Sequence, residues 1–261
     1  MSTFDRNSNT RYAAAGAQAQ AGVYDEGLRA YMLGVYNYMA FGLAITGVLA
    51  LATAYFATTQ DSAQAVATLG NGTMLTQLGY MLYGSPLKWV VMLAPLAMVF
   101  FLSFKVQSMS ASTAQITFWA FAALMGLSLS SIFLVYTGGS IARVFFITAA
   151  SFGALSLYGY TTKKDLSGWG SFLFMGLIGI IIASLVNLFL ASSALQFAIS
   201  VIGVLVFAGL TAYDTQQIKQ MYHAGDSSEV SAKKSIMGAL RLYLDFINLF
   251  LMLLQLFGNR E

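Results

Sequence analysis

The 261-residue sequence contains no cysteine and a single histidine, His223. Disulfide bonds and thiolate metal sites are therefore excluded, and one histidine cannot form a histidine-rich metal cluster. Charged residues are also scarce: they make up 9% of the chain, against roughly a quarter in soluble domains. Because 58% of the residues are hydrophobic, the composition predicts a protein that is solvated by lipid.

The first thirty residues lack a hydrophobic stretch. A cleavable signal peptide needs such a stretch directly after its basic residues, so the sequence predicts none. This segment is rich in Ala, Gln, Ser and Asn. We expect residues 1–30 to form a polar, disordered cytoplasmic tail that turns helical near residues 24–30.

Seven apolar runs follow the tail, each long enough for the roughly 20 residues that a membrane-spanning helix needs. The expected fold is an all-α polytopic membrane protein with seven transmembrane helices, in a membrane domain over residues 31–258. The predicted spans are 31–56, 87–107, 113–136, 141–161, 169–191, 195–218 and 234–257.

Basic residues gather on one side of these spans. Ten Lys and Arg residues fall on the N-terminal side of the membrane, and three fall on the other side: Lys88, Arg143 and Arg260. Cytoplasmic flanks carry the excess of positive charge, so we expect a cytoplasmic N-terminus and a periplasmic C-terminus. The net charge of +3 then reflects topology, and no nucleic-acid partner is expected.

One connection between spans is long, residues 57–86, on the predicted non-cytoplasmic side. It is rich in Thr, Gly and Ser and almost uncharged. We expect a flexible loop, with a partly ordered lid or an interfacial helix as the alternatives.

Two acidic residues fall inside the predicted spans. Asp214 lies near the end of the sixth, and Asp245 lies in the seventh with apolar residues on both sides. An ionisable group at membrane depth costs several kcal/mol, so it indicates a function. The two spans run antiparallel across a short connection, which brings both aspartates to similar depths, within about two turns at 1.5 Å per residue. The sequence therefore predicts a facing pair of carboxylates.

Such a pair predicts proton and cation chemistry. Two nearby carboxylates in a medium of low dielectric constant cannot both ionise cheaply, so they bind protons as a unit. When deprotonated, Asp214 and Asp245 offer hard oxygen ligands for calcium, with Asn248, backbone carbonyls or water completing the shell. Proton and cation would compete for one site.

A structural ion pair is the alternative explanation of the two aspartates. Arg241 lies four residues before Asp245 on the same helical face, and Lys219 is near Asp214. This alternative accounts better for Asp245 than for Asp214.

Two further classes of protein are disfavoured. Intramembrane aspartyl proteases carry a Gly-x-Gly turn before the second aspartate, whereas Leu242, Tyr243 and Leu244 precede Asp245. A retinal protein needs a lysine in the seventh span, where only Lys234 stands, at the edge. We therefore expect no enzyme.

The segments around the aspartates resemble a known family. AYDTQQIK in the sixth span and LYLDFINLF in the seventh look like signature segments of the Bax inhibitor-1 (transmembrane Bax inhibitor motif) family. The stretch SSIFLVYTGGSIARVFFITAASFGALSLYGYTTKKDLSGWGSFLFMGLIGI is similar to bacterial inner-membrane members. The resemblance covers residues 28–260 and leaves out the tail.

This resemblance implies a last helix at the centre of the bundle and, in at least some members, a pH-sensitive calcium leak. The family's paired aspartates match Asp214 and Asp245. Bacterial relatives have an arginine near the cytoplasmic end of the second span that contacts the charged pair. Lys105 is the nearest equivalent here, and lysine cannot make the same bidentate contact. The candidate accessory residues are Lys105, Arg241, Asn248, Thr215 and Gln216.

We therefore expect a pH-sensitive calcium leak channel of the inner membrane, gated by protonation of the Asp214/Asp245 pair. Calcium is the expected transported ion, and no covalent cofactor is expected. The alternative is a regulatory protein that binds other membrane proteins, such as a membrane-bound quality-control protease, through residues 1–30. Otherwise the expected partner is the lipid bilayer, and the chain is a monomer or a weak homo-oligomer.

Overall fold

The computed structural model describes residues 3–70 and 72–260, with side chains from Glu26 onward. Seven helices in this part of the chain are long and apolar enough to cross a membrane, which confirms the predicted fold class. Each overlaps a predicted span, and most ends agree within a few residues. Their bounds are α1 (Thr3–Ala57), α3 (Leu87–Lys105), α4 (Ala111–Leu129), α5 (Gly138–Thr161), α6 (Ser167–Leu190), α7 (Ser193–Gln220) and α8 (Ser228–Phe257).

Hydroxyl side chains mark the starts of four of these helices. The side chain of a Ser or Thr accepts a hydrogen bond from a backbone N–H of the first turn, which satisfies a donor that has no partner inside the helix. These capping residues are Ser110 of α4, Thr137 of α5, Ser192 of α7 and Ser227 of α8. Short 3-10 segments extend α3 (Val106–Ser108) and α4 (Ser130–Leu134).

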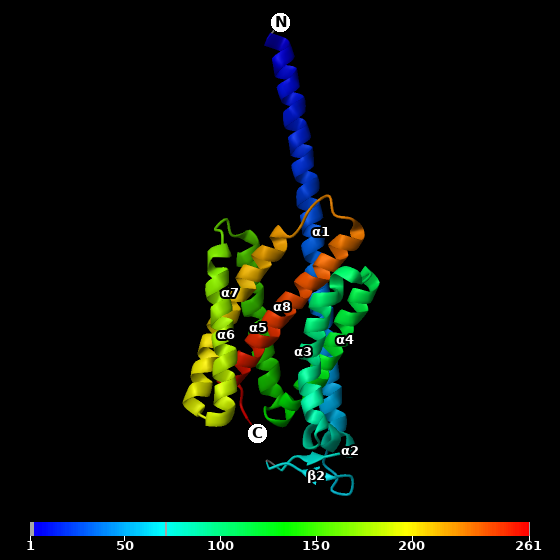
Figure 1. Ribbon diagram of the computed structural model, residues 1–261, viewed down its shortest axis with the longest axis vertical. Helices are drawn as coiled ribbons and strands as arrows, with labels where there is room; N and C mark the ends of the chain where they lie inside the picture. Colours follow the sequence, from blue (N-terminus) through cyan, green and yellow to red (C-terminus); the bar gives the residue numbers. More distant parts are fainter. Residues whose placement is uncertain (1–2, 71, 261) are drawn as a thin grey trace.

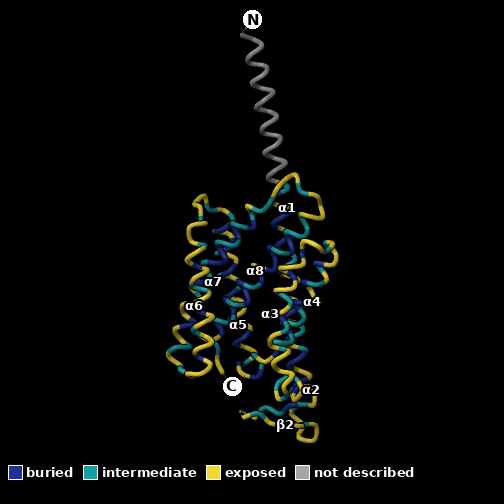
Figure 2. Tube along the Cα trace, viewed as in Figure 1, coloured by how far each residue is buried: buried dark blue, intermediate teal, exposed yellow. Residues whose placement is uncertain are grey.

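Helix α8 lies at the centre of the bundle, as predicted. It runs obliquely between the other helices and contacts α1, α4, α5 and α7 (Figure 1). In the apolar 18-residue stretch that marks α8 as a membrane span, 67% of the residues are buried. In the corresponding stretch of α6, which faces outward, 11% are buried (Figure 2). The buried trace of α8 is therefore enclosed by protein, while α6 presents its side chains to lipid.

Tyr243 ties α8 to two neighbouring helices. Its side chain is fully buried, and its ring packs edge-on against Phe118 and Phe121 of α4. The Tyr243 hydroxyl donates to Oγ1 of Thr46 (2.6 Å), which in turn donates to the carbonyl of Ala122 (2.8 Å). This chain of hydrogen bonds joins α8, α1 and α4 at membrane depth, where each polar group needs a protein partner.

The connection after α1, where the sequence predicts a flexible loop over residues 57–86, contains short strands and helical segments in its described part. Three short antiparallel strands form a sheet in the order β1 (Thr58–Thr59), β3 (Met74–Leu75), β2 (Ala67–Thr68). A helical turn, α2 (Gln77–Gly79), and a π-helical segment (Tyr80–Gly84) follow.

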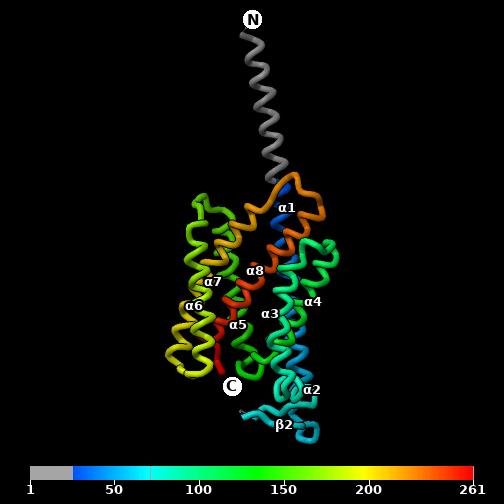
Figure 3. Tube along the Cα trace, in the orientation of Figure 1, coloured from blue at the N-terminus to red at the C-terminus, as the bar shows by residue number. Residues whose placement is uncertain are grey.

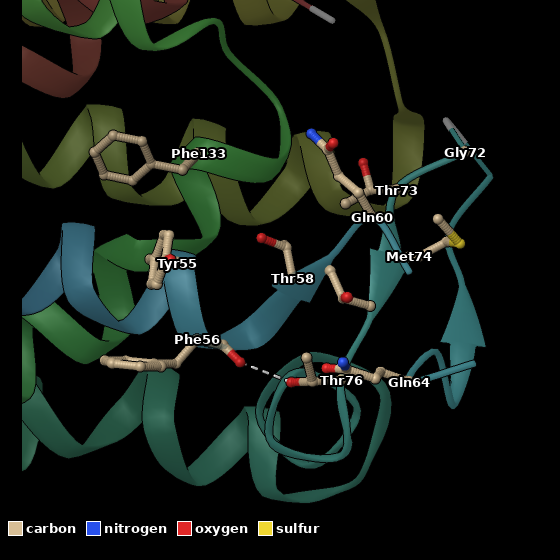
Figure 4. A pocket seen from close by; sticks show the side chains of 11 residues that line it. Tyr55, Phe56, Thr58, Gln60, Gln64, Gly72, Thr73, Met74, Thr76 and Phe133 are labelled. Carbon is tan, nitrogen blue, oxygen red and sulfur yellow. Dashed lines mark hydrogen bonds between the residues drawn. The ribbon is translucent and has the colours of Figure 1, made fainter. Parts of the chain in front are cut away.

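Side-chain bonds hold this small sheet against the bundle. Thr76 donates to the carbonyl of Phe56 at the end of α1 (2.8 Å; Figure 4). Tyr83 bonds Ser130 (2.7 Å), and burial raises the pKa of Tyr83. A cavity of about 730 Å³ lies between the sheet and the end of α1 (Figure 4).

The start of the membrane domain also differs from the prediction. Helix α1 begins at Thr3, and its membrane-spanning part covers Glu26–Ala57. Leu28 is only 6% exposed and belongs to the hydrophobic core, so the boundary predicted at residue 30 falls inside the span. The other expectations for the tail fall on residues 1–25, outside the part whose side chains are described.

Helices α5 and α7 cross closely at Gly159. A Cβ atom added there would overlap the backbone carbonyl of Ala212, whereas one added at Gly153 of the same helix would meet no atom within 4 Å. Small residues allow transmembrane backbones to approach in this way.

We expect Gly159→Ala to lower the free energy of unfolding by about 1–3 kcal/mol, because α5 and α7 must separate to accept the methyl group. Gly153→Ala is the matched control and should change it by no more than about 0.5 kcal/mol. Denaturant unfolding in detergent measures both variants. Equal losses of stability would contradict the close crossing.

Candidate proton and cation site

Asp214 of α7 and Asp245 of α8 meet inside the bundle. Their carboxyl groups are close enough to share a hydrogen bond, so the facing pair predicted from antiparallel spans is present. Asp245 is 5% exposed, and its Oδ2 atom has no hydrogen-bond partner among the residues that the structure describes. Asp214 is partly buried and lies six residues, or about 9 Å, before the end of α7 at Gln220.

The two carboxyls form an isolated pair. Within residues 26–70 and 72–260, no group of three or more His, Cys, Asp and Glu side chains gathers at one place. Apolar side chains surround Asp245 along α8, where Leu242, Phe246 and Leu249 are all buried. The pair therefore offers at most four carboxylate oxygens in otherwise apolar surroundings.

Arg241 provides the positive charge that reaches the pair. It lies one turn before Asp245 on α8, and its charge acts on both Asp214 and Asp245. The Arg241 side chain is exposed, and it forms no direct ion pair with either carboxylate in the described chain. The ion pair considered as an alternative for Asp245 is therefore a longer-range attraction.

Lys219 points away from the pair. Its ammonium group donates to the carbonyl oxygen of Tyr160 (2.9 Å) and lies 5.0 Å from the centre of the Tyr160 ring. The ion pair considered between Lys219 and Asp214 is therefore absent. Through these contacts, the Lys219 side chain of α7 packs against the last turn of α5.

Lys105 stands in the last turn of α3 with its side chain exposed. The described residues offer it no ion pair, so it does not contact the aspartates in this structure. A latch at Lys105 stays a prediction.

The other accessory residues have partners of their own. Asn248 lies three residues, or about one turn, after Asp245. Its amide nitrogen donates to the carbonyl of Leu244 (2.8 Å), and this bond does not use its amide oxygen. Gln216 bonds the carbonyl of Lys164 and the N–H of Leu166 (2.8 Å each), which fastens the α5–α6 connection to α7. In that connection, the N–H and hydroxyl of Ser167 lower the pKa of the exposed Asp165 carboxyl.

Thr215 belongs to a hydrogen-bonded chain that the sequence did not predict. Tyr36 of α1 bonds Ser156 of α5 (2.7 Å), Ser156 bonds Thr215 (2.9 Å), and Thr215 donates to the carbonyl of Thr211 (2.7 Å). The chain ends beside Asp214. Tyr and Ser are common in membrane helices, so only spatial proximity distinguishes these residues.

Tyr31 of α1 is a buried polar residue that the sequence did not single out. Among the described residues, its hydroxyl has no hydrogen-bond partner. The Tyr31 ring lies 5.7 Å from the ring of Tyr222, so Tyr31 packs against the connection of α7 to α8. In that connection, Asp226 is paired with Lys234 (2.6 Å) at the start of α8.

Comparison with known proteins agrees with this architecture. A family model described as "Inhibitor of apoptosis-promoting Bax1" matches residues 28–261. An uncharacterized protein of Rickettsia prowazekii is 51% identical over 91% of this chain and 93% of its own length. The Escherichia coli (strain K12) inner membrane protein YbhL is 50% identical over 90% of this chain and 94% of its own length.

The family match extends across all seven membrane-spanning helices, and the relationship to an inner membrane protein fits their length and composition. The chain is therefore a multi-pass inner membrane protein that belongs to the Bax inhibitor-1 family.

Proposed function

We propose that this protein is a pH-sensitive calcium leak channel of the inner membrane, gated by protonation of the Asp214/Asp245 pair. One observation carries the proposal: the two carboxyl groups lie close enough inside the bundle to share a hydrogen bond, and Asp245 Oδ2 has no other partner among the described residues. A hydrogen bond between two carboxyls requires a proton on one of them.

Loss of that proton changes the forces at the site. Two ionised carboxylates at hydrogen-bonding distance repel each other, and the apolar surroundings of Asp245 strengthen the repulsion. Arg241 is the only positive charge among the described residues that acts on both groups. The ionised pair can relax by separating α7 from α8, by drawing in Arg241, or by binding a cation. Each of these responses makes the site sensitive to pH.

The ligand set favours transient binding of the cation. Calcium takes six to eight oxygen ligands, and the pair supplies at most four, with the Asn248 amide oxygen nearby. Water and backbone carbonyls would complete the shell. A site with so few protein ligands suits passage of an ion better than its storage.

Beyond Asp245, the interior of the bundle is filled by packed side chains, and an ion would find no open path there. The next polar cluster on α8 is at Gln255, ten residues or about 15 Å farther along, where it bonds Gln196 (2.5 Å) and Ser200 (2.8 Å) of α7. Buried apolar side chains fill the interval: Phe246, Leu249, Phe250, Leu253 and Leu254. Conduction would require helices to move apart along this apolar interval.

We expect Asp214→Asn and Asp245→Asn each to abolish the pH dependence of calcium release, and the double variant to give a flat profile, because an amide does not titrate in this range. Release from calcium-loaded liposomes across pH measures this. Asp61→Asn, an exposed aspartate in the β-sheet connection, is the matched control and should keep the wild-type profile.

A double variant with a normal pH profile would disprove gating by the pair. A wild-type protein that releases no calcium at any pH would reject the channel itself and favour the regulatory alternative.

We expect Arg241→Gln to move the midpoint of the pH profile upward by roughly one unit, which corresponds to about 1.4 kcal/mol. Removing the positive charge makes the ionised pair less favourable, so the proton is lost only at higher pH. Lys105→Gln removes an exposed charge that contacts neither aspartate and should leave the midpoint in place. A shift with Lys105→Gln alone would assign the controlling charge to α3 instead.

A further inference from the structure

A groove lies between α1 and α5 on the side where α1 enters the membrane domain. Its volume is about 680 Å³. Exposed apolar side chains border it, among them Leu33 (50% exposed) and Leu157 (63% exposed), so it opens sideways toward lipid. The other lining residues that matter here are Arg29, Tyr36, Gly153 and Tyr160.

The groove extends along the membrane normal. Arg29 and Tyr160 stand near the ends of their spans, at the predicted cytoplasmic boundary, while Tyr36 stands seven residues or about 10 Å deeper on α1. The Tyr36–Ser156 hydrogen bond (2.7 Å) spans from α1 to α5 there. The site is thus polar at its mouth and apolar along its walls.

The mouth carries positive charge. Arg29 is exposed and has no carboxylate partner in the described part of the chain, and Lys219 contacts only the carbonyl and ring of Tyr160. Lys163 and Lys164 are exposed on the connection that follows α5. Asp165 is the acidic residue of that connection, and Ser167 donates to it. Glu26 lies three residues before Arg29 on α1, so four basic groups stand against two carboxylates in the described part of this region.

We propose that this groove binds one anionic phospholipid, with its phosphate at Arg29 and an acyl chain along Leu33, Gly153 and Leu157. The lateral opening and the apolar walls match an acyl chain, and the basic mouth matches an anionic headgroup, which Lys and Arg side chains near the membrane surface attract. A helix of a second copy, about 10–12 Å wide, is too thick for a groove of small-molecule size.

Gly153 provides a direct test. A Cβ atom at this position meets nothing within 4 Å, so a larger side chain can grow into the groove without displacing protein atoms. Gly179 of α6 is equally open and exposed, away from the groove, and serves as its matched control.

Native mass spectrometry of the full chain with phosphatidylglycerol or phosphatidylcholine of identical acyl chains measures the binding. We expect the wild-type protein to retain one phosphatidylglycerol in preference to phosphatidylcholine. Gly153→Leu should lose this lipid, and Gly179→Leu should keep it. Arg29→Gln should reduce the preference for phosphatidylglycerol at least threefold, while Arg143→Gln, at the opposite end of α5, should not.

Thermal unfolding of each variant checks that it is folded, and a variant that unfolds is replaced by Gly153→Val. Several outcomes would overturn the proposal: unchanged lipid retention in Gly153→Leu, equal retention of both lipids by the wild-type protein, or displacement of the lipid by millimolar inorganic phosphate, which would indicate a site for a free anion. None of these results bears on calcium release, so this proposal and the proposed function fail separately.

Discussion

Burial of α8 by its neighbours is the constraint on which the other features depend. A carboxyl group in contact with lipid would be costly, and α8 avoids this by carrying Asp245 on a helix that α1, α4, α5 and α7 enclose. The hydrogen bonds from Tyr243 to Thr46 and from Thr46 to Ala122 hold this central helix to α1 and α4. With α8 fixed in this position, Asp214 of α7 becomes the nearest partner for Asp245.

The red trace of α8 crosses the bundle obliquely (Figure 3), and polar side chains along it form separate groups. Asp245 lies near the middle of α8, the Tyr36–Ser156–Thr215 chain joins α1, α5 and α7, and the cluster around Gln255 lies toward the end of α8. Apolar side chains of α8 fill the interval between them. The polar groups are therefore separated from one another by a packed apolar layer.

The charged residues near the membrane boundary divide into two sets with different surroundings. Arg241 acts on the aspartates, so its charge belongs to the interior site. Arg29 and Lys219 lie beside the groove between α1 and α5, where no carboxylate of the described chain pairs with them. These basic residues count equally when the numbers of Lys and Arg on the two sides of the membrane are compared. Their surroundings differ, because Arg241 lies near buried carboxylates, whereas Arg29 and Lys219 lie beside an apolar groove.

Hydropathy determined the seven spans, because lipid requires a long apolar run for each one, and the short link between the last two spans determined that Asp214 and Asp245 would meet. Only the tertiary structure decided that Lys219 bonds the carbonyl of Tyr160 and that Gln216 bonds the α5–α6 connection. It also decided that three short strands within residues 57–86 pair into a sheet. Long polar side chains can reach several partners, and short Thr-rich segments can form several backbone pairings. Which partner each one takes depends on packing between segments that are distant in the sequence.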